Sequence, residues 1–257
     1  MSFINYVTKT IAIKVVYYGP GLSGKTTNLR YIYLKLDSAY RGDLVCLETD
    51  TDRTYFFDLL PIRAGMIGEF KVHFQLLTVP GQVFYEASRK SVLRGSDGIV
   101  FVADSQVPLL DANLESFDGL RRNCLQHDID LMKIPLVFQY NKRDLSYLIP
   151  VETFNNLFNP GRSPWVEASA VNGVGVFESL REISKLSVPI VREKLFGEKP
   201  HEESDASQLS ARDLDGLQER GPEAGEARAG QLTRVKVKSW QAVEDELDKL
   251  SKEYLRK

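Results

Sequence analysis

The chain has 257 residues with 43% hydrophobic and 26% charged residues, which suffices for one large domain or two small ones. A formal net charge of −2 gives no reason to expect nucleic acid or an anionic membrane as the main partner. Cys46 and Cys124 make no disulfide framework, the start has no signal-peptide pattern, and no apolar run approaches the roughly 18 residues of a membrane span, so we expect a cytoplasmic protein without a direct membrane span.

Short apolar runs alternate with helical patterns up to about Gly197. The runs at residues 11–18, 72–79, 98–103, 135–140 and 165–168 read as strands, and residues 25–36, 110–127, 151–157 and 175–195 read as helices. The runs IVFVA and LVFQY are apolar on both faces of the pleat, which is typical of strands covered on both sides by helices. We therefore predict, for residues 1–197, an α/β fold with a mostly parallel, doubly wound sheet.

The composition changes after Gly197. Residues 198–231 contain no aromatic or β-branched side chain, so we expect a disordered linker there. In residues 232–257, apolar side chains recur three or four positions apart along one helix face: Trp240, Val243, Leu247, Leu250 and Tyr254. This spacing predicts an amphipathic interaction helix, which either docks on a partner or folds back on the domain.

The stretch GPGLSGKT fits the pattern G-x-x-x-x-G-K-[ST] between a predicted strand and a predicted helix. Glycines allow backbone N–H groups to surround phosphate oxygens, and the helix N-terminus presents unpaired N–H groups to the same anion. In this motif the lysine reaches the β- and γ-phosphates and the hydroxyl after it ligates Mg²⁺. An ordinary glycine-rich turn is the alternative. The candidate phosphate-binding residues are Gly19, Gly21, Leu22, Ser23, Gly24, Lys25, Thr26 and Thr27.

A second motif, NKRD, follows the predicted strand PLVFQY at its carboxyl end, where α/β sheets bind ligands. The Asp144 carboxylate can accept hydrogen bonds from N1–H and the amine of guanine, which adenine does not offer in that arrangement. We expect Asn141 to tie this loop to the rest of the site and the stem of Lys142 to lie on the base. The motif argues against a P-loop kinase or ATPase.

A third segment follows the next predicted strand. Ala168-Ser169-Ala170 matches the S-A loop whose backbone N–H can meet the guanine O6. Ser169, Ala170 and Val171 are therefore further candidates for nucleotide binding.

With these motifs the sequence resembles the Ras-like small GTPases, and among them the bacterial gliding-motility (MglA-type) polarity GTPases. The resemblance rests on VVYYGPGLSGKTTNL, TDTDRTYFFD, LLTVPGQVFYEASRK, LRGSDGIVFVADSQ and QYNKRDL, and it covers about residues 1–197. It implies a Ras-like P-loop GTPase fold, GTP/GDP and Mg²⁺ as ligands, and a GTP/GDP switch in cell polarity or motility. It also implies a monomer when free, in the bacterial cytoplasm, with recruitment to poles or membrane complexes through partners.

The resemblance also assigns roles on two switch segments. Thr54 would close onto Mg²⁺ and the γ-phosphate, so that Thr26 and Thr54 are the expected metal ligands. Gly81 would sense the γ-phosphate and Gln82 would orient the attacking water. Arg53 would supply a positive charge from within the chain, and with Gln82 and Lys25 completes the expected catalytic set. The alternatives are a capping threonine, a surface glutamine and a solvated arginine.

One segment departs from the general Ras pattern. Where that pattern has D-x-x-G, this chain has Thr78-Val79-Pro80-Gly81, as the MglA-type proteins do. A threonine lacks the charge that the aspartate presents to Mg²⁺. Asp50, Asp52 or Asp104 could compensate, and the sequence does not distinguish among them.

These features predict slow hydrolysis of GTP by the chain alone. The resemblance implies a dimeric roadblock-fold (MglB-type) GTPase-activating protein, which could act by arranging Arg53 and Gln82. We expect effector proteins to bind the switches, residues 41–58 and 80–94. The alternative is a GTP-binding scaffold with negligible hydrolysis that works through its C-terminal extension.

Overall fold

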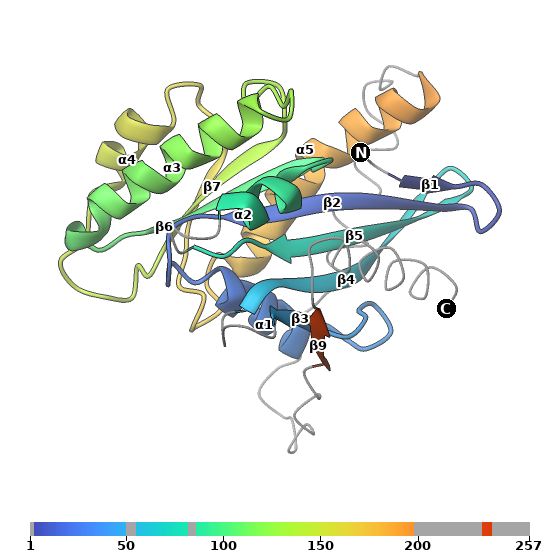
Figure 1. Cartoon of the computed structure of the whole chain (residues 1–257), viewed down its shortest axis with the longest axis horizontal. Coiled ribbons are helices and arrows are strands. Elements are labelled where there is room, and N and C mark those ends of the chain that lie inside the picture. Colours follow the sequence, from blue (N-terminus) through green and yellow to red (C-terminus); the bar gives the residue numbers. More distant parts are fainter. Residues whose placement is uncertain (1–2, 50–54, 82–85, 198–232, 238–257) are drawn as a thin grey trace.

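The computed structural model describes residues 3–49, 55–81, 86–197 and 233–237 (Figure 1). The strands are β1 (Phe3–Asn5), β2 (Thr10–Tyr18), β3 (Val45–Thr49), β4 (Tyr55–Ile67), β5 (Phe70–Thr78), β6 (Gly98–Asp104), β7 (Leu136–Asn141), β8 (Trp165–Glu167) and β9 (Thr233–Val237). The helices are α1 (Lys25–Lys35), α2 (Glu86–Leu93), α3 (Leu110–Leu125), α4 (Val151–Phe158) and α5 (Val176–Phe196), with a short 3₁₀ turn, η2, at Val107–Leu109.

The described strands form one sheet in the order β8-β7-β6-β2-β5-β4-β3-β9, and β1 pairs with β2 outside this path. From β8 to β5 all neighbours are parallel, whereas β4 is antiparallel to both β5 and β3. The parallel part places the carboxyl ends of β2, β6, β7 and β8 at one edge, where α/β sheets bind ligands. The predicted α/β fold with a mostly parallel sheet is therefore confirmed.

The sheet separates two cores, because alternate residues of β2 face opposite sides. Ile11, Ile13, Val15 and Tyr17 pack with side chains of α1 and α5. Val16 and Tyr18 pack with side chains of α2, α3 and α4. Figure 1 shows the helices on both faces of the sheet, and the continuous apolar runs of β2, β6 and β7 follow from this double cover.

Within residues 1–197 the predicted strands and helices all form, with ends shifted by a few residues, but β1, β3, β4 and α2 were not expected. The sequence of β4, YFFDLLPIRAGMI, did not predict a strand, because Asp58, Pro61 and Arg63 interrupt its apolar pattern. Pro61 is tolerated because its carbonyl accepts from Gly42 N, away from β5. Its missing N–H faces the same way and removes no bond from the β4–β5 ladder.

The C-terminal extension contributes a strand where a helix was expected to begin. Residues Thr233–Val237 form β9, parallel to β3, with Val45 opposite Thr233 and Thr49 opposite Val237. The sequence TRVKV alternates β-branched and charged residues, which favours a strand, and β3 offers the backbone groups of a sheet edge. The predicted linker of residues 198–231 and the apolar stripe from Trp240 to Tyr254 lie outside the described residues.

Candidate nucleotide-binding site

The glycine-rich loop connects the carboxyl end of β2 to α1, as the motif requires. Gly19 has φ 149°, and a Cβ there would lie 3.1 Å from the carbonyl carbon of Val102 and closer still to its oxygen. Gly24 has φ 100°, and a Cβ there would collide with the side-chain amide of Asn141. Glycine is therefore needed at both ends of the loop, because β6 and β7 approach its backbone closely.

The residues in the middle of the loop differ in exposure. Leu22 is 92% exposed with φ 61°, and Ser23 is buried. Gly24 is the N-cap of α1, and within the described structure this helix has no side-chain cap and no acidic residue in its first turn, where Thr26 and Thr27 lie half-buried. The first N–H groups of a helix lack intrahelical partners and form a ready site for an anion.

Lys25 folds back over the same loop. Its side chain is only 6% exposed, and Nζ donates to the carbonyl oxygens of Gly19 at 2.9 Å and Pro20 at 2.6 Å. Burial, as the largest cause, and the charge of Arg89 together lower the pKa of Lys25 to about 7, against the opposing effect of Asp58. In the described part of the chain the hydrogen bonds of this ammonium go to neutral carbonyls, and a nearby anion such as a phosphate would stabilise its charge.

Asn141 joins three segments that are far apart in the sequence. Its side-chain Nδ2 donates to the carbonyl of Ser23 at 2.7 Å, and its Oδ1 accepts from the N–H of Ala170 at 2.9 Å. The phosphate loop, the NKRD loop and the S-A loop are thus linked by one buried amide. The structure brings these three predicted segments together at the carboxyl edge of the sheet.

The neighbours of Asn141 differ in exposure. Lys142 forms an ion pair with the buried carboxylate of Asp104, with Nζ and Oδ2 2.6 Å apart. Asp144 and Val171 are exposed, whereas Ser169 and Ala170 are buried. Asp144 is therefore accessible to a base, and Lys142 is held in place beside it.

A buried amide network beneath the loop was not predicted. Asn28 in α1 and Gln139 in β7 exchange two hydrogen bonds of 2.8 and 2.9 Å. Gln139 also donates to Ser179 in α5 at 2.9 Å. The network fixes α1, which carries the phosphate loop, against the strand that leads into NKRD. Its signal in the sequence is one polar residue, Gln139, within the apolar run LVFQY.

In the described structure the carboxylate of Asp58 in β4, which the sequence did not single out, lies beside the expected metal ligand Thr26. Thr26 Oγ1 donates to Asp58 Oδ2 at 2.6 Å, and Thr78 Oγ1 donates to the same oxygen at 3.0 Å. Asp104, one of the proposed substitutes for the missing aspartate, pairs with Lys142 instead, while Asp50 and Asp52 lie outside the described residues. A charged residue inside the apolar stretch FFDLL was the available signal.

The described start of the second switch, at Gly81, lies against the phosphate loop. Gly81 packs against Gly21, so closely that a Cβ on Gly81 would lie 2.6 Å from the carbonyl carbon of Pro20. The three remaining predicted residues, Arg53, Thr54 and Gln82, lie outside the described residues. The described ends on either side of them, Thr49, Tyr55 and Gly81, belong to β3, β4 and the segment after β5.

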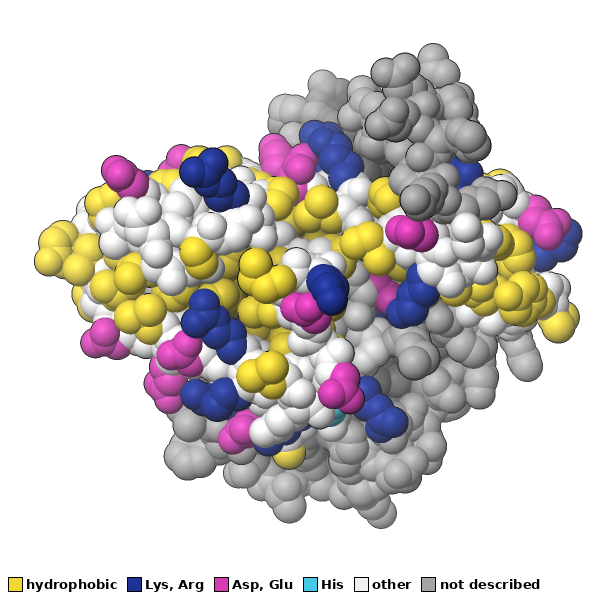
Figure 2. Space-filling model, turned by 90° about the horizontal axis from the view of Figure 1, so that it is seen from above, with side chains coloured by type: hydrophobic (Ala, Val, Ile, Leu, Met, Phe, Trp, Pro, Cys, Tyr) yellow, Lys and Arg dark blue, Asp and Glu magenta, His cyan; other side chains and the backbone are white. Residues whose placement is uncertain are grey.

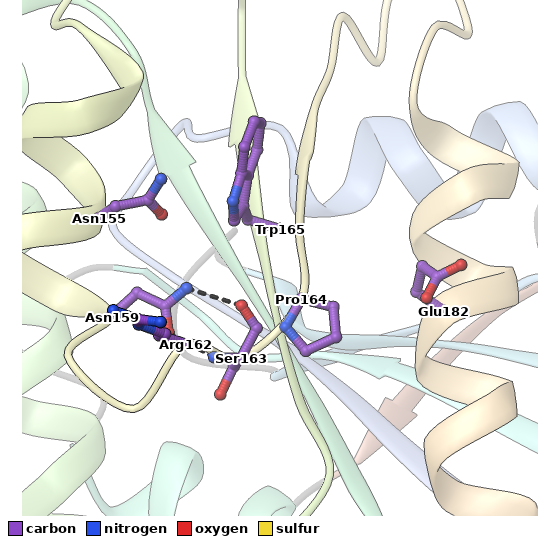
Figure 3. A pocket seen from close by; sticks show the side chains of 7 residues that line it. All are labelled: Asn155, Asn159, Arg162, Ser163, Pro164, Trp165 and Glu182. Carbon is purple, nitrogen blue, oxygen red and sulfur yellow. Dashed lines mark hydrogen bonds between the residues drawn. The ribbon is translucent and has the colours of Figure 1, made fainter.

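A separate cavity of about 570 Å³ lies at the β8 edge of the sheet (Figure 3). Its lining comes from α4, the following loop, β8 and α5: Asn155, Asn159, Arg162, Ser163, Pro164, Trp165 and Glu182. Asn159 and Ser163 hydrogen bond to each other there, at 2.7 Å in both directions. None of the predicted nucleotide-binding residues that the structure describes lines this cavity.

The surface view shows acidic and basic side chains intermingled with hydrophobic ones over the described part of one face (Figure 2). Among the described residues, no group of three or more His, Cys, Asp or Glu side chains is placed to hold a metal ion by itself. No helix in the described ranges is long and apolar enough to cross a membrane.

No family model matches the chain. A curated relative does: the chain is 54% identical over 186 residues to the Mutual gliding-motility protein MglA of Myxococcus xanthus (strain DK1622). The match covers 72% of this chain and 95% of the relative. The similarity therefore extends over nearly the whole length of that protein.

Proposed function

Because the chain belongs to the MglA family of small gliding-motility GTPases, we propose that it is a GTP/GDP switch that hydrolyses GTP slowly alone and faster with an activating partner. The observation that carries this proposal is Asn141, whose single amide connects Ser23 of the phosphate loop with Ala170 of the S-A loop. A protein that binds phosphate and guanine together needs these loops in a fixed relation.

The guanine preference rests on Asp144. This carboxylate is exposed at the carboxyl end of β7, next to Lys142, which Asp104 holds by an ion pair. A free carboxylate rejects a base that lacks two donors in the matching positions, since its own acceptors would then stay unpaired. We assign base recognition to Asp144, and further contacts with the base to Ser169, Ala170 and Val171 of the S-A loop, which Asn141 joins to the phosphate loop.

The expected Mg²⁺ fits the side chains around α1. Mg²⁺ prefers oxygen ligands, and the proton of the Thr26 hydroxyl is donated to Asp58, which leaves the oxygen lone pairs of Thr26 available. Thr26 and Thr54 would hold the ion, which supplies neutralisation of phosphate charge when bound. Lys25, already buried over the loop, adds a second positive charge beside the phosphates.

Hydrolysis would need residues from both switch segments. Gly81 adjoins Gly21 of the phosphate loop, and Gln82 follows Gly81 in the sequence. Arg53 and Thr54 belong to the connection between β3 and β4. An arginine at the transferring phosphate contributes on the order of 10³–10⁵ in rate, and we propose that a roadblock-fold partner acts by arranging Arg53 and Gln82 together.

A second candidate is a GTP-binding scaffold whose output runs through the C-terminal extension. The pairing of β9 with β3 favours it, because the extension contacts the sheet directly before the Arg53–Thr54 connection. In this alternative, hydrolysis is negligible and the state of the extension matters instead.

Phosphate release in single-turnover assays separates the two functions. The switch predicts turnover of GTP and not ATP, accelerated at least about tenfold by a roadblock-fold activating dimer. Arg53→Ala should abolish most of the stimulated rate and leave GTP binding intact. Full stimulated turnover by Arg53→Ala would refute the arginine assignment, and absence of any GTP-dependent turnover would favour the scaffold.

A further inference from the structure

The chain lacks the carboxylate that Ras-like proteins place at the second switch, because Thr78 stands in that position. Thr78 is the last residue of β5, and β4 runs antiparallel beside it, with Leu59 opposite Leu77. This register places Asp58 of β4 beside Thr78. A side chain from the neighbouring strand can therefore reach the region that the missing aspartate would serve.

Asp58 is almost fully buried, at 3% exposed. Its Oδ2 accepts the hydroxyl protons of Thr26 at 2.6 Å and Thr78 at 3.0 Å, and its backbone N–H donates to Thr78 Oγ1 at 2.9 Å. Taking a carboxylate out of water is costly unless it is well paired. Here one of its oxygens faces the hydroxyl expected to ligate Mg²⁺, and the charge also acts on Lys25.

The direction of these hydrogen bonds suits a cation. A threonine hydroxyl has one proton and two lone pairs. Since Thr26 donates its only proton to Asp58, its lone pairs point elsewhere and are free to ligate. A negatively charged acceptor behind a ligand orients that ligand and increases its basicity.

We propose that Asp58 replaces the missing second-switch aspartate as the carboxylate that serves the Mg²⁺ of a bound guanine nucleotide, from β4 instead of β5. Thr78 then acts as the hydrogen-bond donor that holds the carboxylate toward Thr26. The inference rests on the proposed GTP-binding function. Asp58 is a positioning residue in this scheme, because the contact that the structure shows is to Thr26.

The variant Asp58→Asn tests this, since it keeps the size and an acceptor oxygen but removes the charge. The measurement is the release rate of a fluorescent GDP from the full chain as free Mg²⁺ is titrated. We expect the Mg²⁺ concentration that halves the release rate to rise at least about tenfold, the scale seen when a residue that supports a metal ligand is lost. A midpoint within twofold of the wild type would overturn the proposal.

Asp97→Asn is the matched control. Asp97 is also buried, at 8% exposed, and accepts the Lys14 N–H at 2.9 Å, but it precedes β6 at the opposite edge of the sheet. Its Mg²⁺ midpoint should match the wild type. An equal shift in both variants would show a general effect of burial and would contradict a specific role for Asp58.

The double variant Asp58→Thr with Thr78→Asp exchanges the two residues and so places the carboxylate on β5. It tests the role of the carboxylate toward Mg²⁺ if Asp58→Asn fails to fold. A midpoint within about threefold of the wild type supports the proposal, and a shift of tenfold or more contradicts it. If the wild type retained GDP without any dependence on Mg²⁺, the proposed function itself would fail, which is a distinct result.

Discussion

Gly81 and Gly21 lie in direct backbone contact, at the point where the second switch meets the phosphate loop. A Cβ on Gly81 would lie 2.5 Å from Cα of Gly21, closer than packed atoms approach. The reverse contact is looser, since a Cβ on Gly21 would lie 3.7 Å from the Gly81 carbonyl oxygen. The two glycines therefore differ in what a side chain would do, and each carries its own prediction.

Gly81→Ala should force the two loops apart. The nearest atoms are backbone, which cannot rotate away, so we expect the nucleotide-free protein to lose about 1–3 kcal/mol of unfolding free energy. Urea unfolding measures this. Gly119→Ala is the control, because Gly119 lies inside α3 with its nearest neighbour at 3.6 Å and an alanine there should be neutral or stabilising. Equal stability changes in the two variants would contradict the contact.

Gly21→Val should retain GTP binding and lose hydrolysis. A single Cβ fits among the described atoms, but the two further methyl groups would crowd Gly81, which the expected catalytic Gln82 follows in the sequence. We expect single-turnover hydrolysis to fall at least about tenfold with GTP affinity within about threefold of the wild type, and a smaller loss for Gly21→Ala. An unchanged hydrolysis rate in the valine variant would show that this side of the loop is not next to the reacting phosphate.

Asp144→Asn should change the preferred base. An amide presents a donor where the carboxylate presented an acceptor, which suits xanthine better than guanine. Competition binding should show the ratio of GTP to xanthosine triphosphate affinity falling about 100-fold or more. Asp118→Asn, on the exposed side of α3, is the control and should leave the ratio unchanged. The same ratio in both variants would disprove the assignment of Asp144 to the base.

Lys25 should make the stability of the nucleotide-free protein depend on pH. Its pKa is about 7 in the fold against a usual 10.5, so between these values the unfolded chain binds more protons and stability rises with pH. The destabilisation caused by burying the charged form of Lys25 is complete below about pH 7 and disappears as the pH approaches 10.5. Lys25→Met lacks this charge. The unfolding free energy of the variant relative to the wild type should therefore be about 2 kcal/mol more favourable to the variant at pH 7 than at pH 9. A pH-independent difference in urea unfolding would contradict the lowered pKa.

The contact of β9 with β3 should protect the backbone of residues 45–49. N–H groups of alternate residues face the same side of a strand, so Arg234→Pro and Val235→Pro, made separately, test both sides. In hydrogen exchange of the full chain, at least one variant should speed exchange in Val45–Thr49 about tenfold while leaving GTP binding intact. Glu202→Pro, outside β9, is the control. Unchanged protection in both strand variants would show that the extension does not pair with β3.

The sequence by itself determined the family, the parallel part of the sheet and the loops that meet at its carboxyl edge. These follow from local signals: glycines at fixed spacing, a lysine at the start of a helix, and apolar runs buried on both faces. NKRD and GPGLSGKT could be placed at strand ends because the carboxyl ends of parallel strands share one edge.

The tertiary structure decided what depends on contacts between distant residues. Asp58 in β4 contacts Thr26 and Thr78 only because β4 folds back beside β5. Asp104, an equally plausible substitute for the missing aspartate in the sequence, forms an ion pair with Lys142. Strand β9 forms at an edge that belongs to a segment far earlier in the chain. Local patterns specify which residues can bind a charge or a strand, whereas only the packed fold determines which partner each one finds.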